Sequence, residues 1–344
     1  MIKVCLVGVG KRMVNMNLPI LRQLKDEIKI VAATTKSGSI NEKANLNIPV
    51  YTMVTDMCRQ EKPDLVYVSV PHDKTYNLLL QLINCNVPIL VDTPISLSLQ
   101  ETYQIMINSQ EKNVPIAVVE DWPYLPIEQF KKQIINSGAL GKVFSVENDY
   151  RTYDYHGFAQ LRNYLPDNLS AISINQNTTG CMVEKSIRKD GQVTKNEVDV
   201  WRQTFIQFND GSLLVSKYSS LYKKSPYRIF NSLRAYGTKG TIIADCLLDS
   251  HFKLSVLDEL GVTHDLPINI VGEKSNVESI STILPNKQQI KWINPFFHMS
   301  LDEFQIGIAC HVKQMIEFVK GEGDILYDSK DFFNDLKHFY GKNL

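Results

Sequence analysis

The chain has no long hydrophobic run and no excess of charge of either sign. Lys, Asp, Asn or Pro interrupts every apolar stretch before it reaches the roughly 18 residues needed to cross a bilayer, so we expect no membrane partner. Lys and Arg together number 37, as do Asp and Glu, which leaves no overall positive field to attract nucleic-acid phosphates. We therefore expect no nucleic acid among the partners.

Clustered cysteines and histidines are also missing. The six cysteines are spaced singly, with neither the pairs of a zinc site nor the density of a disulfide scaffold. The seven histidines show no ligand spacing, so we expect no metal. The first residues have strand character without the basic and apolar regions of a signal peptide, and this indicates a cytoplasmic protein.

Strand-like and helical segments alternate through the first third of the sequence. Runs rich in Val, Ile and Leu lie at residues 2–7, 28–34, 64–70, 87–91 and 114–119, and helical patterns at 18–24, 74–84 and 97–109. Strands that are apolar on both faces and alternate with helices are typical of a parallel sheet covered by crossover helices. We predict a Rossmann-type, doubly wound α/β domain over residues 1–122 that binds a dinucleotide.

The pattern changes after Pro123. Strands with polar alternation lie at residues 143–151, 200–208 and 212–218, which indicates antiparallel pairing with one polar face. Residues 269–294 are polar and weakly periodic, and we interpret them as a long surface excursion. We predict a second, α+β domain over residues 123–344, built on an open antiparallel sheet. The length of 344 residues is enough for two such cores.

A glycine-rich bend joins the first strand to the first helix. Gly8 permits a tight turn, and Gly10 lets the backbone approach a pyrophosphate at the helix N-terminus. Met13 takes the place of the motif's third glycine, so a turn that binds nothing stays open as the alternative. The predicted cofactor site at this bend consists of Gly8, Val9, Gly10, Lys11, Arg12 and Met13.

The end of the second strand carries no carboxylate. In NAD-binding Rossmann domains an acidic side chain about 20 residues past the bend binds the ribose hydroxyls. The cofactor-binding candidates here are instead Thr34, Thr35, Lys36 and Ser37. Because Lys36 offers a cation to a 2′-phosphate, we predict a preference for NADP(H) over NAD(H). Lys11 or Arg12 either adds to this site or is a solvated surface charge.

Several short motifs follow one another along nearly the whole chain. They are the glycine bend, the strand that ends in Pro71, Asp92-Thr93-Pro94, and the turns at residues 137–143 and 236–241. Their order and spacing resemble those of the GFO/IDH/MocA oxidoreductases, the family of glucose-fructose oxidoreductase and inositol dehydrogenase. The resemblance implies an oxidoreductase with a small-molecule substrate. It also implies an open sheet in the second domain that commonly mediates homo-oligomerisation.

Two departures from the family pattern bear on the chemistry. Thr93 stands where the family has a lysine that assists proton transfer, and a threonine hydroxyl is no general acid near neutral pH. The family's Asp-x-Gly-x-x-His signature is absent as well. We therefore predict a reductase that delivers hydride to an imine or a conjugated double bond. A sugar or cyclitol dehydrogenase and a non-catalytic cofactor-binding homologue are the alternatives.

The nearest counterpart of that signature supplies candidate proton donors. An imidazole can donate a proton near pH 7, and His156 lies close to the position of the family's histidine, although a helix-capping role is the alternative. Tyr153 and Tyr155 flank it, and we include them and Thr93 as catalytic candidates. Arg162 is positioned in sequence to clamp a substrate carboxylate, or else to bridge to an acid of the fold.

Polar residues also follow the predicted strands of the first domain. Ligands of doubly wound sheets bind at the carboxyl ends of the strands, so side chains at these positions are candidates for the site. Asp121 is a substrate-binding candidate. The remaining cofactor-binding candidates are Pro71, His72, Asp92, Thr93 and Glu120.

Overall fold

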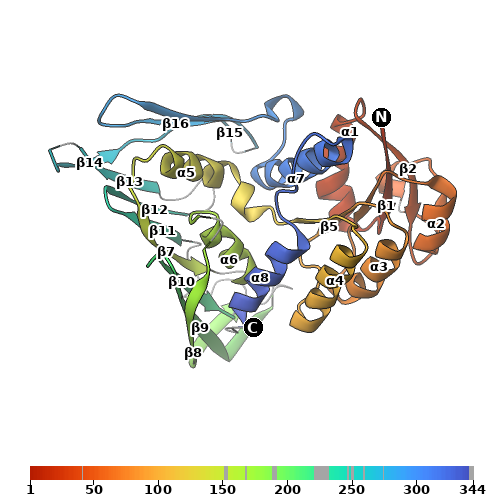
Figure 1. The fold of residues 1–344 in the computed structure, drawn as a ribbon, viewed down its shortest axis with the longest axis horizontal. Coiled ribbons are helices and arrows are strands. Elements are labelled where there is room, and N and C mark those ends of the chain that lie inside the picture. Colours follow the sequence, from red (N-terminus) through yellow and green to blue (C-terminus); the bar gives the residue numbers. More distant parts are fainter. Residues whose placement is uncertain are drawn as a thin grey trace. The chain divides into compact units, whose positions relative to one another are not determined.

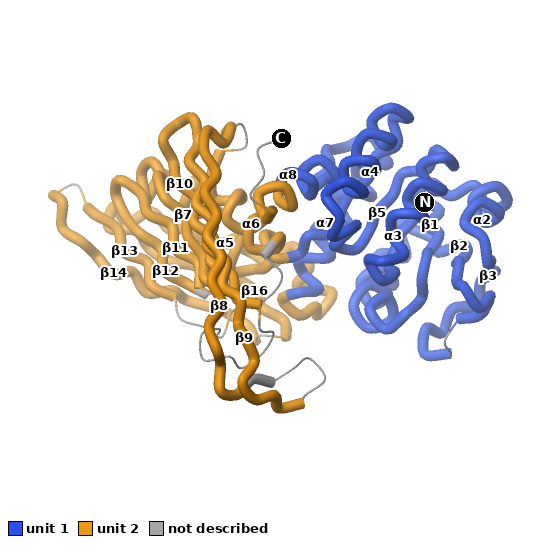
Figure 2. Tube along the Cα trace, turned by 90° about the horizontal axis from the view of Figure 1, so that it is seen from below, with its two compact units in different colours: residues 1–121, 304–334 blue, residues 122–303, 335–344 orange. Residues whose placement is uncertain are grey.

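The computed structural model describes residues 1–40, 42–150, 154–166, 169–187, 192–220, 232–245, 248, 252–258, 260–273 and 275–340. The chain forms two compact units (Figure 2): unit 1 comprises residues 1–121 and 304–334, and unit 2 comprises residues 122–303 and 335–344. Each unit has its own sheet and its own buried apolar side chains. Among the described residues, no helix is both long and apolar enough to cross a membrane.

Unit 1 is built on a parallel sheet (Figure 1). Its strand order is β3-β2-β1-β4-β5-β6. The strands are β1 (Ile2–Val7), β2 (Ile28–Thr34), β3 (Val50–Tyr51), β4 (Leu65–Val68), β5 (Ile89–Asp92) and β6 (Ile116–Val119). In the central strand β1, Val4, Cys5 and Leu6 are all buried, as expected for a strand covered on both faces. The strand order is that of a doubly wound sheet, so the predicted Rossmann architecture is confirmed.

Amphipathic helices connect these strands. They are α1 (Leu18–Gln23), α2 (Val54–Glu61), α3 (His72–Asn84) and α4 (Leu99–Glu111). The buried face of α3 carries Leu79, Leu82 and Ile83, at the spacing of successive helical turns. The N-terminus of α4 is capped by Ser98, whose hydroxyl accepts the N–H of Glu101.

The chain returns to unit 1 near its C-terminus. Residues 304–334 carry most of α7 (Glu303–Lys320) and the start of α8 (Ser329–Phe339). The Lys313 ammonium lies 2.7 Å from the Glu27 carboxylate at the start of β2, which ties α7 to the sheet. From the sequence we assigned all of residues 123–344 to a second domain. The helical pattern of the return segment is visible in the sequence, but the sheet that it contacts is not.

Unit 2 contains a larger sheet with the order β14-β13-β12-β11-β7-β10-β9-β8. The strands are β7 (Val143–Tyr150), β8 (Ala171–Ile187), β9 (Val193–Phe208), β10 (Leu213–Ser219), β11 (Ser232–Gly237), β12 (Gly240–Asp245), β13 (Phe252–Leu257) and β14 (Thr263–Leu266). All neighbouring strands are antiparallel except β7 and β10, which are parallel. The predicted open sheet is thus confirmed but mixed. The parallel pair is possible because α6 (Asp154–Arg162), β8 and β9 lie between its strands in sequence and provide the long connection.

The interpretation of residues 269–294 as a surface excursion is wrong. They form a three-stranded antiparallel sheet of β15 (Asn269–Glu273), β16 (Asn276–Ile283) and β17 (Gln289–Ile293). Ile280 and Trp292 are buried, and helix α5 (Pro126–Asn136) packs against β16 and β17. β15 is exposed along its length, β17 alternates exposed and buried residues, and three of the buried residues of β16 are Ser279, Ser281 and Thr282. The apolar positions are therefore too few in sequence to stand out as strands.

Three buried polar side chains lie where α6 packs on β7 and β10. Asn148 on β7 and Ser216 on β10 are paired in register, and the Asn148 amide donates to the Gly157 carbonyl of α6. Gln160, one helical turn beyond Gly157, has no exposed surface. Both polar atoms of Gln160, together with Asn148 Oδ1 and Ser216 Oγ, have no hydrogen-bond partner among the described residues. Unpaired groups of this kind cost about 1–3 kcal/mol each.

Replacing Gln160 with methionine is expected to leave the free energy of unfolding unchanged or to raise it by about 1–2 kcal/mol, because two unpaired polar atoms are removed at constant volume. Asn148→Leu is the matched comparison. It is expected to destabilise by about 1 kcal/mol or more, since it removes the hydrogen bond to the Gly157 carbonyl. Urea denaturation followed by tryptophan fluorescence measures both, because Trp122, Trp201 and Trp292 all lie in unit 2. A clear loss of stability in Gln160→Met would contradict this account.

Candidate functional site

The bend after β1 has the geometry that a pyrophosphate requires. Gly8 has φ +83°, and a Cβ atom on it would stand 2.5 Å from the Ser69 carbonyl oxygen, so only glycine fits. The Gly8 N–H donates to the Thr34 carbonyl at 2.9 Å, which fixes the bend to β2. A Cβ atom on Gly10 would meet nothing within 4 Å. The backbone at Gly10 is therefore bare on that side and leaves room for a bound phosphate group.

The helix that follows the bend opens with an unusually wide turn. Residues Met13–Asn17 are π-helical and lead directly into α1. Met13, at the position of the missing third glycine, is fully buried, and so is Asn17 at the other end of the wide turn. Single π-helical turns occur often at functional sites. Here the wide turn coincides with the departure from the glycine motif and directs Asn17 toward the end of β5.

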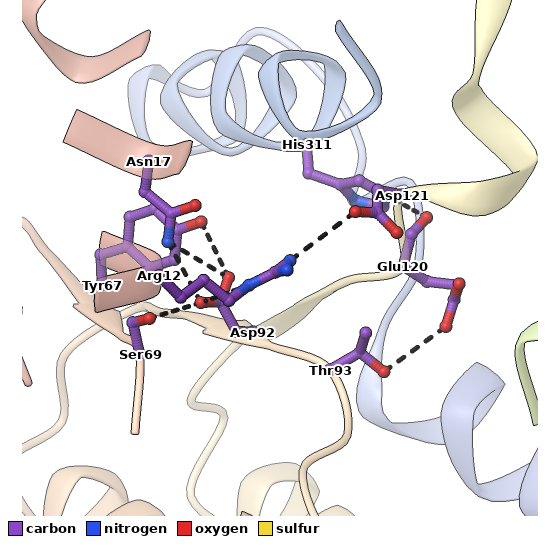
Figure 3. A network of polar contacts seen from close by, with 9 residues as sticks. All are labelled: Arg12, Asn17, Tyr67, Ser69, Asp92, Thr93, Glu120, Asp121 and His311. Atoms are coloured by element: carbon purple, nitrogen blue, oxygen red, sulfur yellow. Dashed lines mark hydrogen bonds and ion pairs between the residues drawn. The ribbon is translucent and has the colours of Figure 1, made fainter. Parts of the chain in front are cut away.

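Asp92, the last residue of β5, is the centre of a hydrogen-bond network (Figure 3). Its carboxylate accepts hydrogen bonds from Arg12 Nε at 3.1 Å, Asn17 Nδ2 at 3.1 Å, Tyr67 OH at 3.0 Å and Ser69 Oγ at 2.5 Å. These donors come from the bend, the wide turn, and β4 with the residue that follows it. Asp92 therefore joins the three segments that border the cofactor position.

Arg12 lies between two carboxylates. Its Nη2 atom is 3.6 Å from Asp121 Oδ2, on the side away from Asp92 (Figure 3). Burial disfavours the charged form of Arg12, but Asp92 and Asp121 more than offset this, so the pKa of the guanidinium is raised above its usual value. Burial and the Asp92 carboxylate also raise the pKa of the Tyr67 phenol well above its usual value, so Tyr67 is a fixed hydrogen-bond donor.

Thr93 and Glu120 follow the adjacent strands β5 and β6. Thr93 Oγ1 donates to Glu120 Oε2 at 3.4 Å (Figure 3), and Glu120 has no exposed surface. The Glu120 backbone carbonyl lies 2.8 Å from His311 Nε2 of α7. Burial lowers the pKa of His311 to about 4, in spite of this hydrogen bond, so the ring is neutral near pH 7 and donates to the carbonyl.

The end of β2 presents mainly hydroxyl groups and one lysine. Thr34 is buried and its hydroxyl donates to Met57 Sδ at 2.9 Å. The Thr35 hydroxyl donates to the Ser39 carbonyl at 2.8 Å, and the Ser37 hydroxyl lies 3.0 Å from that of Ser39. The Lys36 side chain is exposed. Of the four predicted residues, Thr35, Lys36 and Ser37 therefore lie just after β2, whereas Thr34 is the last, buried residue of the strand.

The catalytic candidates of unit 2 lie on or near α6. Tyr155 and His156 are buried with ring centroids 4.4 Å apart, and the Trp122 ring lies 5.9 Å from that of His156. Tyr153 lies outside the described residues. Arg162 pairs with Asp335 of α8, with 3.0 Å between Nε and Oδ1. This ion pair is the alternative given in the sequence analysis, a bridge to an acid of the fold. The role of Arg162 in binding a substrate carboxylate stays a prediction.

The structure brings together part of the predicted site in unit 1. Arg12, Asp92, Thr93, Glu120 and Asp121 form the cluster of Figure 3, whereas Pro71 and His72 lie exposed at the start of α3. The network residues that the sequence analysis missed are Asn17, Tyr67, Ser69 and His311. The helical pattern around Asn17 and the end of strand β4 at Ser69 are the only sequence signals that could have indicated two of them. Among the described residues, no group of His, Cys, Asp and Glu side chains is arranged to hold a metal ion.

A doubly wound sheet with a bare glycine bend at the end of β1 defines a dinucleotide-binding Rossmann domain. Residues 2–120 match the model of the GFO/IDH/MocA oxidoreductase family, which has an NAD-binding Rossmann fold. An uncharacterized oxidoreductase of Schizosaccharomyces pombe is 23% identical over 151 residues. That match covers 43% of this chain and 41% of the relative, so it spans less than half the length of either protein.

Solved structures with the same fold cover nearly the whole chain. An NAD binding oxidoreductase from Klebsiella pneumoniae has a TM-score of 0.72 at 13% identity, covering 99% of this chain and 95% of that chain. An oxidoreductase from Agrobacterium radiobacter in complex with NAD+, L-tartaric acid and magnesium has a TM-score of 0.68 at 14% identity, with coverages of 98% and 94%. At such identities the likeness establishes the fold.

Proposed function

We propose that the protein is an NADP(H)-dependent reductase that transfers hydride to an imine or a conjugated double bond of a small molecule. The bend at Gly8 and Gly10 carries this proposal: Gly8 is held where only glycine fits, and Gly10 exposes bare backbone before a helix N-terminus. When bound, the reduced nicotinamide would supply the hydride. The amides of the bend would hold the pyrophosphate, and the Asp92 network would keep the bend, β4 and β5 in register.

The choice of NADP(H) rests on the end of β2. In the strand order of unit 1, the adenosine half of a dinucleotide lies on the β2 side of β1, where an acidic residue would bind the ribose of NAD. Residues 34–37 contain no carboxylate, and the exposed ammonium of Lys36 is available for a 2′-phosphate. Arg12 is committed to Asp92 and Asp121, so the phosphate contact falls to Lys36, with Lys11 as the second cation.

Lys36→Asp is expected to weaken NADPH binding by about tenfold or more, because a cation is replaced by an anion that repels the 2′-phosphate. NADH binding is expected to change little or to improve. The control is Lys29→Asp, which makes the same charge change at an exposed position near the other end of β2. Titrations that follow the fluorescence of the reduced nicotinamide measure all four affinities. Tighter binding of NADH than NADPH by the unmodified protein would overturn the cofactor assignment, and binding of neither would overturn the proposed function.

The substrate class follows from Thr93. A hydroxyl at this position supplies a hydrogen bond but not a strong base, which favours reduction over the deprotonation of an alcohol. NADPH oxidation with 1-pyrroline or 2-cyclohexen-1-one supports the proposal, whereas NADP+ reduction with myo-inositol or glucose in their place would favour a dehydrogenase. We further propose that unit 2 supplies the substrate-binding groups and the sheet surface of a homo-oligomer, and that the protein works in the cytoplasm.

A further inference from the structure

Thr93 and Glu120 occupy equivalent places on neighbouring parallel strands. Asp92 of β5 is paired in register with Val119 of β6, so the next residue on each strand, Thr93 and Glu120, projects from the same edge of the sheet. Their side chains meet through the hydrogen bond from Thr93 Oγ1 to Glu120 Oε2. At 3.4 Å this bond is longer than the usual 2.7–2.8 Å of a hydroxyl–oxygen hydrogen bond.

The direction of the Glu120 carboxylate is fixed by its surroundings. The side chain is completely buried, and the backbone is held on one side by His311 and on the other by the hydrogen bond from its N–H to the Val118 carbonyl. Because His311 is neutral near pH 7, it anchors the backbone without adding a charge beside the carboxylate. Burial of the side chain and the two backbone hydrogen bonds therefore hold Glu120 where its carboxylate contacts Thr93.

The other two carboxylates of the cluster are engaged differently. Asp92 already accepts four hydrogen bonds, one of them from Arg12, and Asp121 faces the guanidinium of the same arginine. An arginine does not release a proton at any working pH. The Thr93 hydroxyl, in contrast, carries a proton that it can pass on and replace, and Thr93 is only partly buried. Asp92 also accepts from the hydroxyls of Tyr67 and Ser69, but both of these residues are buried, whereas the hydroxyl that contacts Glu120 belongs to the partly buried Thr93.

The pair lies on the nicotinamide side of the sheet. In the order β3-β2-β1-β4-β5-β6, the adenosine half of a dinucleotide belongs to the β2 side, so the nicotinamide half belongs above the ends of β4, β5 and β6. Thr93 and Glu120 follow β5 and β6 directly. A substrate that receives hydride at this end of the cofactor would come within reach of the Thr93 hydroxyl.

We propose that Glu120 and Thr93 form a proton relay for the reduction, an inference that rests on the proposed function. When bound, the reduced nicotinamide would supply the hydride for a new C–H bond, and the electron pair of the C=N or C=C bond would move to its far atom. For this step Glu120 carries a proton and donates to Thr93, the reverse of the hydrogen bond in the structure. The far atom takes the proton of the Thr93 hydroxyl, and the proton of the Glu120 carboxyl group re-forms the Thr93 O–H bond. The carboxylate left on Glu120 is protonated again by water. Thr93 contacts the substrate, and Glu120 acts through it.

The relay is tested with matched variants of each member. Glu120→Gln keeps the shape of the side chain and an oxygen that accepts from Thr93 but has no proton to give, and Thr93→Val keeps the shape but removes the hydroxyl. Both are expected to lower kcat with 1-pyrroline or 2-cyclohexen-1-one by about 100-fold or more, with the Kd for NADPH changed by less than about threefold. Thr93→Ser is expected to retain most of the activity. Glu111→Gln, at the exposed end of α4, is the control.

The pH profile separates a relay from a structural role. In a relay, kcat falls at the pH where the proton donor loses its proton. This fall is expected in the wild type and in Thr93→Ser. It is expected at a shifted pH in Glu120→Asp and is expected to be absent in Glu120→Gln. A Glu120→Gln variant with wild-type kcat and pH profile would overturn the relay alone. Loss of NADPH binding in Glu120→Gln would also overturn it, because Glu120 would then be a cofactor ligand. A wild type that binds NADPH but reduces neither probe would overturn the proposed function, and the relay with it.

Discussion

Gly8→Ala is expected to lower the free energy of unfolding of unit 1 by about 3 kcal/mol or more and to abolish measurable nucleotide binding. The positive φ of +83° is strained for any residue with a side chain. The added Cβ atom would also stand 2.5 Å from the Ser69 carbonyl oxygen and 2.6 Å from Val70 Cγ1. Because a backbone oxygen cannot rotate away, the end of β4 or the bend itself must move.

Gly10→Ala is the control for this prediction. Gly10 does not have a positive φ, and its added Cβ atom would meet nothing within 4 Å, so the free energy of unfolding is expected to change by less than about 1 kcal/mol. NADPH affinity is nevertheless expected to fall by about tenfold or more, because the methyl group takes the space beside the bend that a pyrophosphate would use. Thermal melts followed by circular dichroism and NADPH fluorescence titrations measure the two effects. A Gly8→Ala variant with wild-type melting and binding would disprove the assigned geometry.

The sequence is most informative where strands are buried on both faces. β1, β2 and β6 of unit 1 are nearly continuous runs of Val, Ile, Leu and Ala, and the predicted ranges agree with them to within two residues. The two-residue strand β3 is too short to produce any such run and was missed. In unit 2 the strands β15–β17 were also missed, because β15 is exposed along its length and polar residues, some of them buried in β16, dilute the apolar pattern.

The sequence allowed individual residues of the site to be predicted, but not the contacts between them. Asp92, Thr93 and Glu120 were identified because each follows an apolar run, and strand ends of a parallel sheet meet at one edge. Their partners depend on contacts that no local pattern encodes. Tyr67 has the appearance of an ordinary buried strand residue, and His311 lies 191 positions from Glu120 in sequence. Only the folded chain shows that these residues hold the carboxylates in place.

Helix α5 of unit 2 contains a completely buried ion pair. Lys131 Nζ lies 2.5 Å from Glu128 Oε1, one turn earlier on the helix, and neither side chain has any exposed surface. The Tyr164 hydroxyl, just beyond α6, donates to the other oxygen of Glu128. The carboxylate therefore links α5 to the segment after α6. Neither charge is solvated by bulk water, so each depends on the other for compensation.

Lys131→Met is expected to lower the free energy of unfolding of unit 2 by about 3–5 kcal/mol, because it removes the ammonium that faces a buried carboxylate. The double variant Glu128→Leu/Lys131→Met carries neither charge of the pair and is expected to lose less, about 1–2 kcal/mol, mostly because the hydrogen bond from Tyr164 to Glu128 is lost. Urea denaturation followed by tryptophan fluorescence is a suitable measurement, because all three tryptophans lie in unit 2.

The comparison of the single and double variants decides what the pair contributes. If the charges are coupled, the double variant must be more stable than Lys131→Met. Independent effects would instead add and make the double variant the less stable one. If the double variant is instead the less stable of the two, the pair stabilises α5 through packing and hydrogen bonds rather than through mutual compensation of charge. In the first case the pair is retained at little net gain in stability, so its value to the protein lies in fixing the register of α5 against the chain at Tyr164.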